Sequence, residues 1–198
     1  MAGIYIHIPF CKQACNYCNF YFSTSLHFKD KLIEALLKEI DLQKNYFKGE
    51  TVSSIYFGGG TPSILSSNEI QKILTKIQET FEIDKAPEIT LEGNPDDLNI
   101  KKLHALYEIG VNRLSIGTQS FIKEDLLFMN RVHSAKEAEQ CIKDAGKVGF
   151  RDLSIDLIYG APSQSSSSWK KNLDILQHLE INHLSSYALT VEENTPLY

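Results

Sequence analysis

The sequence predicts an α/β fold built on a parallel sheet, and three observations favour it. Six short apolar runs alternate along the chain with five stretches of helical periodicity. Strands that alternate with amphipathic helices are typical of βα units, whose crossover connections make neighbouring strands parallel. The conspicuous motifs follow predicted strands, and functional side chains of parallel α/β folds gather at those ends. We find no linker and no internal repeat, so residues 1–198 are predicted to form one domain.

The predicted strands are short and rich in apolar residues. They comprise Ile4–Ile8, Ser54–Phe57, Glu88–Glu92, Arg113–Gly117, Leu153–Ile158 and His183–Leu189. Apolar residues at helical spacing predict helices between them, over Phe28–Ile40, Ile70–Phe81, Asn99–Ile109, Ala135–Val148 and Trp169–Leu179. Ser67 is the expected cap of the second helix, and Gly110 and Gly149 end the third and fourth. Ser165–Ser168 is predicted to be a polar loop.

The pattern stops after the sixth strand, before a sixth helix. The last residues, 191–198, are mostly polar and carry no helical periodicity. A parallel strand without a covering helix would expose apolar surface. We therefore expect the chain to be the N-terminal part of a longer protein, truncated after its sixth strand.

The composition is that of a globular protein and excludes some classes of function. The chain has 198 residues, of which 42% are hydrophobic and 23% charged, with a net charge of −5. The absence of a basic excess argues against a nucleic-acid partner. No segment reaches the roughly 20 apolar residues of a membrane span. Because the first strand begins near Ile4, no targeting segment is expected, and the predicted location is the cytoplasm.

Three cysteines form the most informative motif. Cys11, Cys15 and Cys18 lie within eight residues, directly after the first predicted strand. In a reducing compartment, clustered cysteines indicate metal binding or catalysis. A four-iron cluster takes four cysteines and a structural zinc site takes four ligands, so three cysteines leave one metal position open. Two alternatives remain, which are a zinc site completed by His7 and three merely buried thiols. Cys141, alone in a predicted helix, is expected to be a small buried hydrophobic residue.

A glycine-rich turn, Gly58-Gly-Gly-Thr-Pro62, follows the second predicted strand. Glycines let a backbone bend sharply and approach a ligand closely, with free N–H groups. The turn lacks the Gly-Lys-Ser/Thr ending of a phosphate-binding loop. Alone it is a weak signal, because many strand-to-loop turns are rich in glycine.

Four polar residues near strand ends are further candidates for a ligand site. Taken singly, Glu92 and Gln119 are expected to be solvated side chains at strand ends. Asp156 lies within an apolar strand, so it must be paired or face a ligand to offset its desolvation. Arg131 has the fork geometry for a bidentate pair with a carboxylate, although a solvated arginine is the commoner case.

Taken together, these residues resemble the radical S-adenosylmethionine (SAM) superfamily, and within it the group of the oxygen-independent coproporphyrinogen III oxidase. The cysteine spacing is the superfamily signature, and the resemblance rests on a series of motifs that occur in order. The series is Tyr5-Ile-His-Ile-Pro-Phe-Cys11, Gly58-Gly-Gly-Thr-Pro62, Glu92-Gly-Asn-Pro95, Asn112-Arg-Leu-Ser-Ile-Gly-Thr-Gln-Ser-Phe121, Asn130-Arg-Val-His133, Asp156-Leu-Ile-Tyr-Gly-Ala-Pro162 and Ser186-Tyr-Ala-Leu-Thr-Val-Glu192. It spans nearly the whole chain.

This resemblance implies a fold and a set of cofactors. The fold would be a partial (β/α)₆ barrel, similar to a TIM barrel, with the cysteine loop after the first strand. Cys11, Cys15 and Cys18 would bind three irons of a [4Fe–4S] cluster, and the amino and carboxylate groups of SAM would chelate the fourth. In such proteins the cofactors carry the chemistry, while the protein binds and orients them.

The resemblance also implies roles for residues that match family positions. Tyr5 and Gly59 match positions that line the cluster-bound SAM, and Glu92 matches the carboxylate that contacts it. Six further residues match positions that hold a second SAM in the oxidase, so one or two molecules are expected. These six are Tyr17, Gly60, Thr61, Gln119, Arg131 and Asp156.

Two departures separate this chain from the oxidase. The oxidase carries a further cysteine two residues after the cluster motif, where this chain has Phe20, and it has an N-terminal extension, whereas ten residues precede Cys11 here. Both departures favour the HemW-type heme chaperone branch, whose members bind heme and are thought to pass it to an acceptor protein. The resemblance thus implies heme as cargo, an unknown acceptor and a reducing electron donor. It leaves open whether SAM is cleaved, and it makes coproporphyrinogen oxidase activity doubtful.

Three rival hypotheses stay open at this point. They are an oxidase of porphyrin biosynthesis, a non-functional remnant of a longer chain, and a zinc-binding module. The six histidines are conceivable heme ligands, but a structural or solvated role is expected for each of His7, His27, His104, His133, His178 and His183.

Overall fold

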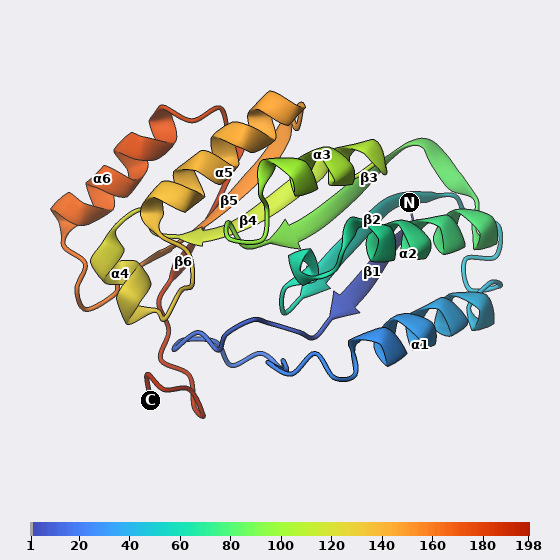
Figure 1. Cartoon of the computed structure of the whole chain (residues 1–198), viewed down its shortest axis with the longest axis horizontal. Coiled ribbons are helices and arrows are strands. Elements are labelled where there is room, and N and C mark those ends of the chain that lie inside the picture. Colours follow the sequence, from blue (N-terminus) through green and yellow to red (C-terminus); the bar gives the residue numbers. More distant parts are fainter. Residues whose placement is uncertain (1) are drawn as a thin grey trace.

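The computed structural model describes residues 2–198, which form one six-stranded parallel sheet with helices along one face (Figure 1). The strands are β1 (Ala2–Ile8), β2 (Val52–Gly59), β3 (Ile83–Gly93), β4 (Arg113–Gln119), β5 (Asp152–Tyr159) and β6 (His183–Ala188). Every pair is parallel, and the strands lie side by side in chain order. The predicted α/β class and all six strands are confirmed.

The helices agree with the prediction in number and place, apart from two short additions. They are α1 (Lys29–Leu42), the 3₁₀ helix η1 (Pro62–Ile64), α2 (Ser67–Thr80), α3 (Ile100–Glu108), α4 (Lys123–Phe128), α5 (Ala135–Val148) and α6 (Ser166–Gln177). The sequence did not predict η1 and α4, because three and six residues are too few to establish a helical period.

Two predicted helix starts were wrong by a few residues. The cap of α2 is Ser66, because its hydroxyl accepts a hydrogen bond from the Glu69 amide while the Glu69 carboxylate accepts from the Ser66 amide, at 2.7 Å. Ser67 is already helical. Likewise, the predicted loop 165–168 contains the cap and first turn of α6, since Ser165 accepts a hydrogen bond from the Ser168 amide at 3.1 Å. Serines at the start of a helix look like a polar loop when only composition is considered.

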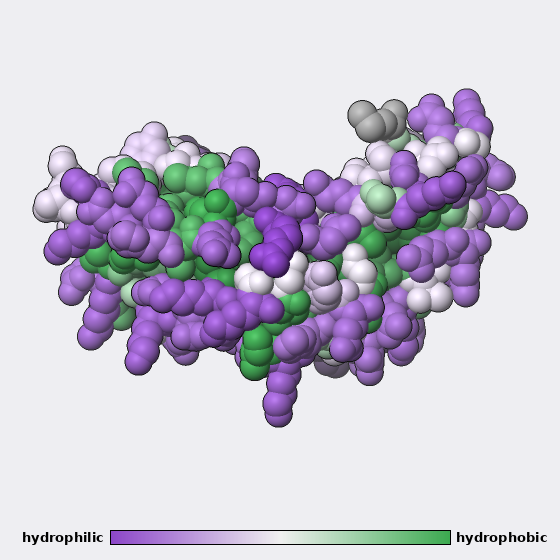
Figure 2. Space-filling view, turned by 90° about the horizontal axis from the view of Figure 1, so that it is seen from above, coloured by the Kyte–Doolittle hydropathy of each residue, from purple (hydrophilic) through white to green (hydrophobic). Residues whose placement is uncertain are grey.

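The two faces of the sheet have opposite chemistry. On the face under the helices lie fully buried apolar side chains, such as Phe57 and Leu114, which share one core with α2, α3 and α5. On the other face, Tyr56 donates a hydrogen bond to Glu92 at 2.7 Å, and Ser115 donates to Asp156 at 3.3 Å. Figure 2 shows that the molecule is crescent-shaped and hollowed along one side. The sheet therefore resembles an open barrel whose lining is polar.

The last strand is the least covered. No helix follows β6 among residues 2–198, and Leu184 and Tyr187 are 37% and 57% exposed. The expectation of an uncovered sixth strand is therefore confirmed. No helix in this described part of the chain is both long and apolar enough to cross a membrane.

A buried polar network joins the loops that follow β4 and β5. Asn172 of α6 is fully buried, and its side-chain oxygen accepts a hydrogen bond from the Phe121 amide at 2.7 Å. The buried carboxylate of Asp125 accepts from the hydroxyls of Ser120, at 2.8 Å, and Ser163, at 3.1 Å. Because each partner is satisfied inside the protein, the network fixes the two loops relative to each other.

We expect Asn172→Ala to lower the free energy of unfolding by about 2 kcal/mol, because it leaves the buried Phe121 amide without a partner. Urea denaturation measures this change. The matched control is Gln177→Ala on the exposed side of the same helix, which should change the free energy by less than about 0.5 kcal/mol. Equal effects of the two substitutions would contradict the role given to the network.

Candidate functional site

A cavity of about 470 Å³ opens at the carboxyl ends of the strands. It is bounded by the cysteine loop, the ends of β2 to β4 with the loops that follow them, the end of β5, and the end of β6 with the residues after it. Of the predicted site residues, eleven line it, namely Cys11, Cys15, Tyr17, Cys18, Gly59, Gly60, Thr61, Glu92, Gln119, Arg131 and Asp156. Tyr5 lies below the cavity on the polar face, where its ring stacks on that of Tyr56 at 5.9 Å between centroids. The fold thus brings the predicted residues together, while their individual roles remain predictions.

The three cysteines of the loop are free and partly buried. The Sγ atom of Cys11 accepts a hydrogen bond from the Thr61 hydroxyl at 3.4 Å, and that of Cys15 accepts from Nη1 of Arg131 at 3.2 Å. Burial raises the pKa of the Cys11 and Cys18 thiols. Cys141 is buried in α5, where burial raises its pKa to about 12, as expected for a structural thiol.

The donor set fits an iron–sulfur cluster better than a single metal ion. Three thiols from one short loop border one cavity, which is the ligand chemistry of such clusters. Within residues 2–198, no three His, Cys, Asp or Glu side chains have the arrangement needed to hold one metal ion. His7, which the zinc hypothesis requires as a fourth ligand, has its Nδ1 3.2 Å from the Tyr5 hydroxyl.

The cysteine loop is held on two sides by the rest of the site. On one side, the Lys12 ammonium pairs with Asp96 at 2.8 Å and with Asp97. On the other side, the side chain of Asn130 donates to the carbonyl of Ala14 at 2.7 Å and accepts from the Gln13 amide at 2.8 Å. The loop is therefore anchored to the rest of the protein on both sides.

The same corner between α4 and α5 also bonds Asn16. The Asn16 side chain donates to the carbonyl of Phe128 at 2.7 Å, and its backbone amide donates to the carbonyl of Met129 at 3.2 Å. Asn130 itself has a left-handed backbone with φ of +56°. Asparagine tolerates this conformation better than most residues, which explains its place at the corner.

The glycine-rich turn after β2 makes room for the cysteine loop. A Cβ atom on Gly60 would lie 2.7 Å from the carbonyl oxygen of Phe10 and 3.0 Å from Sγ of Cys11. Gly59 has φ of +118°, and a Cβ there would meet the His7 ring at 2.8 Å. Glycine is thus required twice, because the backbone passes so close to β1 and to the first cysteine.

Two carboxylates face the cavity from neighbouring parts of the sheet. Glu92 accepts hydrogen bonds from the Tyr56 hydroxyl at 2.7 Å and from the Gly59 amide at 3.2 Å. Burial raises the pKa of Glu92 in spite of these hydrogen bonds. Burial also raises the pKa of Asp156, which accepts from Ser115. Both groups have accepting capacity directed at the cavity, as a ligand with N–H or O–H donors would need.

Gln119 and Tyr17 complete the cavity wall. Gln119 ends β4 with φ of +65°, and the pairing of β4 with β5 shifts register just before it. A left-handed backbone at a non-glycine residue is strained, and such strain clusters at functional sites. Tyr17 lies between two cysteines of the loop, and burial raises the pKa of its hydroxyl.

His133, named above among conceivable heme ligands, is a structural residue. It is 3% exposed, and its Nε2 lies 3.0 Å from the carbonyl oxygen of Thr118. A carbonyl only accepts, so Nε2 carries the proton of the neutral ring. Burial, together with the nearby Arg131 cation, lowers the pKa of His133 to about 4.

Several residues of the site were missed by the sequence analysis. Lys12, Asn94, Ser115 and Asn130 all contact predicted site residues or hold their loops. Lys12, Asn94 and Asn130 lie inside motifs that were recognised, so their positions in those motifs were the available signal. Ser115 likewise lies inside the recognised motif Asn112–Phe121, so the same signal was available for it.

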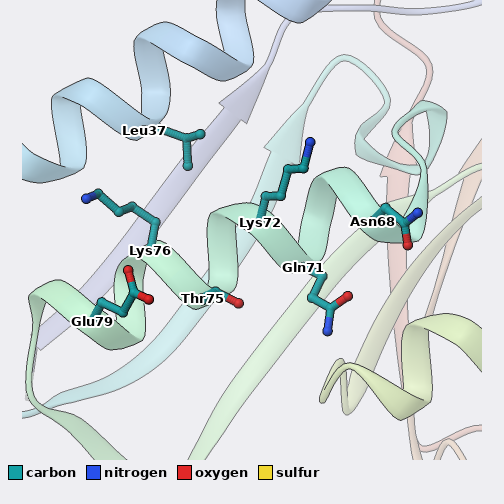
Figure 3. A pocket seen from close by; sticks show the side chains of 7 residues that line it. All are labelled: Leu37, Asn68, Gln71, Lys72, Thr75, Lys76 and Glu79. Atoms are coloured by element: carbon teal, nitrogen blue, oxygen red, sulfur yellow. The ribbon is translucent and has the colours of Figure 1, made fainter.

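A second hollow, of about 460 Å³, lies outside the sheet between α1 and α2 (Figure 3). It is lined by Leu37 of α1 and by long polar side chains of α2, among them Lys72 and Glu79. Lys76 in its wall pairs with Asp41 of α1 at 2.5 Å. None of the predicted site residues contributes to it, so the cavity at the strand ends remains the candidate site.

Comparisons with known proteins agree with this geometry. The sequence profile of the radical SAM superfamily matches residues 5–176, and the chain belongs to this superfamily. It is 39% identical to heme chaperone HemW of Escherichia coli strain K12, over 98% of this chain and 52% of that protein. It is 35% identical to the mitochondrial radical S-adenosyl methionine domain-containing protein 1 of Danio rerio, over 100% of this chain and 45% of that one.

A solved structure gives the same result for the fold. Coproporphyrinogen III oxidase (HemN) from Escherichia coli superposes with a TM-score of 0.89 at 32% identity, over 96% of this chain and 44% of that one. The chain spans about half the length of the curated relatives it matches. The predicted partial radical SAM barrel is confirmed, and membership of the superfamily implies a [4Fe–4S] cluster and SAM as cofactors.

We expect Gly60→Ala to weaken iron retention roughly tenfold or more, the usual effect of disturbing a residue behind a metal ligand. The added methyl group would displace the Phe10 carbonyl and Cys11. Iron and sulfide are to be measured after anaerobic reconstitution and desalting. Gly146→Ala in α5 is the control, because a Cβ there meets nothing within 4 Å; equal iron contents would refute this account of the turn.

His133 should make stability depend on pH. Its pKa is about 4 in the folded chain and about 6.5 when unfolded, so the unfolded state takes up a proton first as the pH falls. The free energy of unfolding should therefore decrease by about 1–2 kcal/mol between pH 7 and pH 5 on account of this group. His133→Gln should remove that part of the decrease in urea titrations at both pH values. The exposed His104→Gln should leave it unchanged; an identical pH dependence in all three proteins would contradict the prediction.

Proposed function

We propose that this chain is the cofactor-binding part of a heme chaperone. In this proposal Cys11, Cys15 and Cys18 hold a [4Fe–4S] cluster, and heme is the cargo passed to an acceptor protein. The observation that carries it is the match over the whole chain to proteins named heme chaperone HemW. A second support is Phe20, which occupies the place of the oxidase's further cysteine and is 72% exposed.

The residues of the cavity have complementary tasks in this proposal. Tyr5, Gly59 and Glu92 serve the SAM on the cluster, with the Glu92 carboxylate accepting hydrogen bonds from it. When bound, cluster and SAM together supply one-electron reductive cleavage of a carbon–sulfur bond. The polar sheet face and the buried loop network hold the ligand groups in place and limit access of water.

Binding of a second SAM, as in the oxidase, has less support in this chain than binding of the SAM on the cluster. Gly60, Thr61, Gln119 and Asp156 line one wall of the cavity, together with Tyr17. The hydroxyl of Thr61 already donates to Cys11. One SAM is therefore the minimum that we propose, and the residues just named mark the candidate place for a second.

The partners and location follow from the same proposal. A reducing electron donor, an acceptor for heme and the cytoplasm are expected. Oxidative decarboxylation of coproporphyrinogen III is the alternative, supported by the likeness to the oxidase structure.

We expect the anaerobically reconstituted, reduced protein to give an electron paramagnetic resonance signal of a four-iron cluster that changes when SAM is added. SAM would change it because three cysteines leave one iron open. Cys15→Ser is expected to lose most of the signal, and Cys141→Ser, a thiol outside the loop, to retain it.

Heme and porphyrin assays on the same samples separate the candidates. Heme binding without formation of protoporphyrinogen from coproporphyrinogen III supports the chaperone. Porphyrin formation would instead establish the oxidase. A signal that does not change on addition of SAM would contradict the proposed SAM site, and zinc in place of iron would refute the cluster.

A further inference from the structure

The guanidinium of Arg131 is already engaged by the protein on both of its terminal nitrogens. Nη1 donates to Sγ of Cys15 at 3.2 Å. Nη2 donates to the side-chain oxygen of Asn94 and to the carbonyl oxygen of Gly117, both at 2.7 Å. Both N–H groups of Nη2 are therefore engaged, and what remains is one N–H of Nη1 and Nε, which is buried and has no partner in the described structure. The guanidinium therefore has no free pair of N–H groups that could bind the carboxylate of a small molecule in a bidentate way.

The placement of Arg131 is tied to the cysteine loop through its neighbour. Asn130 bonds Gln13 and Ala14 of that loop, and the Arg131 amide donates to the Leu126 carbonyl at 2.9 Å. The cation and the thiol are consequently held by the same corner of the chain. A shift of one would require a shift of the other.

Arg131 also dominates the charge of the cavity. Among the lining residues of the described chain it is the only lysine or arginine, whereas Glu92, Asp156 and Glu192 are acidic. Its contact with Cys15 therefore places the one positive charge of the wall against a cluster ligand. Reduction adds an electron to a cluster, so a nearby cation and an N–H···S hydrogen bond favour the reduced form and raise the reduction potential.

We propose that Arg131 is a positioning residue of the cluster ligand Cys15 and sets the reduction potential of the cluster, and that it does not hold a second SAM. The inference rests on the proposed cluster site. It replaces the role that the sequence comparison gave to Arg131, because the contacts that the role requires are occupied by Cys15, Asn94 and Gly117.

The test is a redox titration of the reconstituted full chain, followed by electron paramagnetic resonance in the absence of SAM. Arg131→Gln should make one-electron reduction at least tenfold less favourable, a potential more negative by about 59 mV or more. Arg131→Lys keeps the charge but not the fork, so its potential should lie between the two. Arg151→Gln removes an exposed arginine elsewhere and should leave the potential unchanged.

SAM binding, measured by equilibrium dialysis with labelled SAM, distinguishes the rival role. An unshifted potential in Arg131→Gln, with the number of bound SAM molecules falling from two to one, overturns the proposal. A shifted potential with the same number of bound SAM molecules as the wild type supports it. If Arg131→Gln binds too little iron to titrate, a lowered potential in Arg131→Lys still supports the proposal and an unchanged one overturns it. A wild-type protein without a cluster would overturn the proposed function itself.

Discussion

The structure depends on the strict alternation of side chains along its strands. Apolar residues such as Phe57 and Leu114 point beneath the helices, and polar residues such as Tyr56 and Ser115 point into the hollow. A parallel sheet covered on both faces has strands that are apolar throughout, and the interior of a closed TIM barrel is packed with branched side chains. Here the face under the helices carries the hydrophobic core of the sheet. The other face is thereby left free to bind polar ligands.

The cofactor loop depends on a second set of contacts, and these are polar. Lys12 pairs with carboxylates of the loop after β3, and Asn130 bonds the loop from the opposite side. Gly60 lets the turn after β2 approach from a third direction. The loop that carries the three cysteines is therefore held from three directions by the rest of the protein. Arg131 is part of this frame, and that is why its charge reaches Cys15.

Most of the fold could be predicted because the spacing of apolar residues along each segment indicates a strand or a helix. The six strands and five main helices each have enough residues to show a period. The misses have local physical reasons. Strand β3 begins at Ile83, five residues before the predicted start, because residues 84–88 are largely polar and the early pairing is with Val52. The start of α6 was missed because it consists of serines. A serine acts as a helix cap only if its hydroxyl accepts a hydrogen bond from a backbone amide of the first turn, as Ser165 does here.

The site could be predicted only as a set of residues. Motif positions place eleven of twelve predicted residues around one cavity. The sequence could not predict which of these residues form hydrogen bonds with one another. Arg131 illustrates this, because its pairing with Cys15 and Asn94 joins segments that are 116 and 37 residues apart. His133 likewise shows no sign of burial in the sequence, since its partner is a backbone carbonyl.

An open sheet has two edge strands at which strands of other molecules could pair. Strands β1 and β6 have a neighbour on one side only, so each presents a row of backbone groups without a strand partner in the described chain. Rows of this kind are templates for strand addition, which closed barrels avoid by having no edge. On β6 the risk is greater, because Leu184 and Tyr187 stand exposed beside the edge. Within the described residues, the two outer strands are therefore the places where another strand could be added to the sheet.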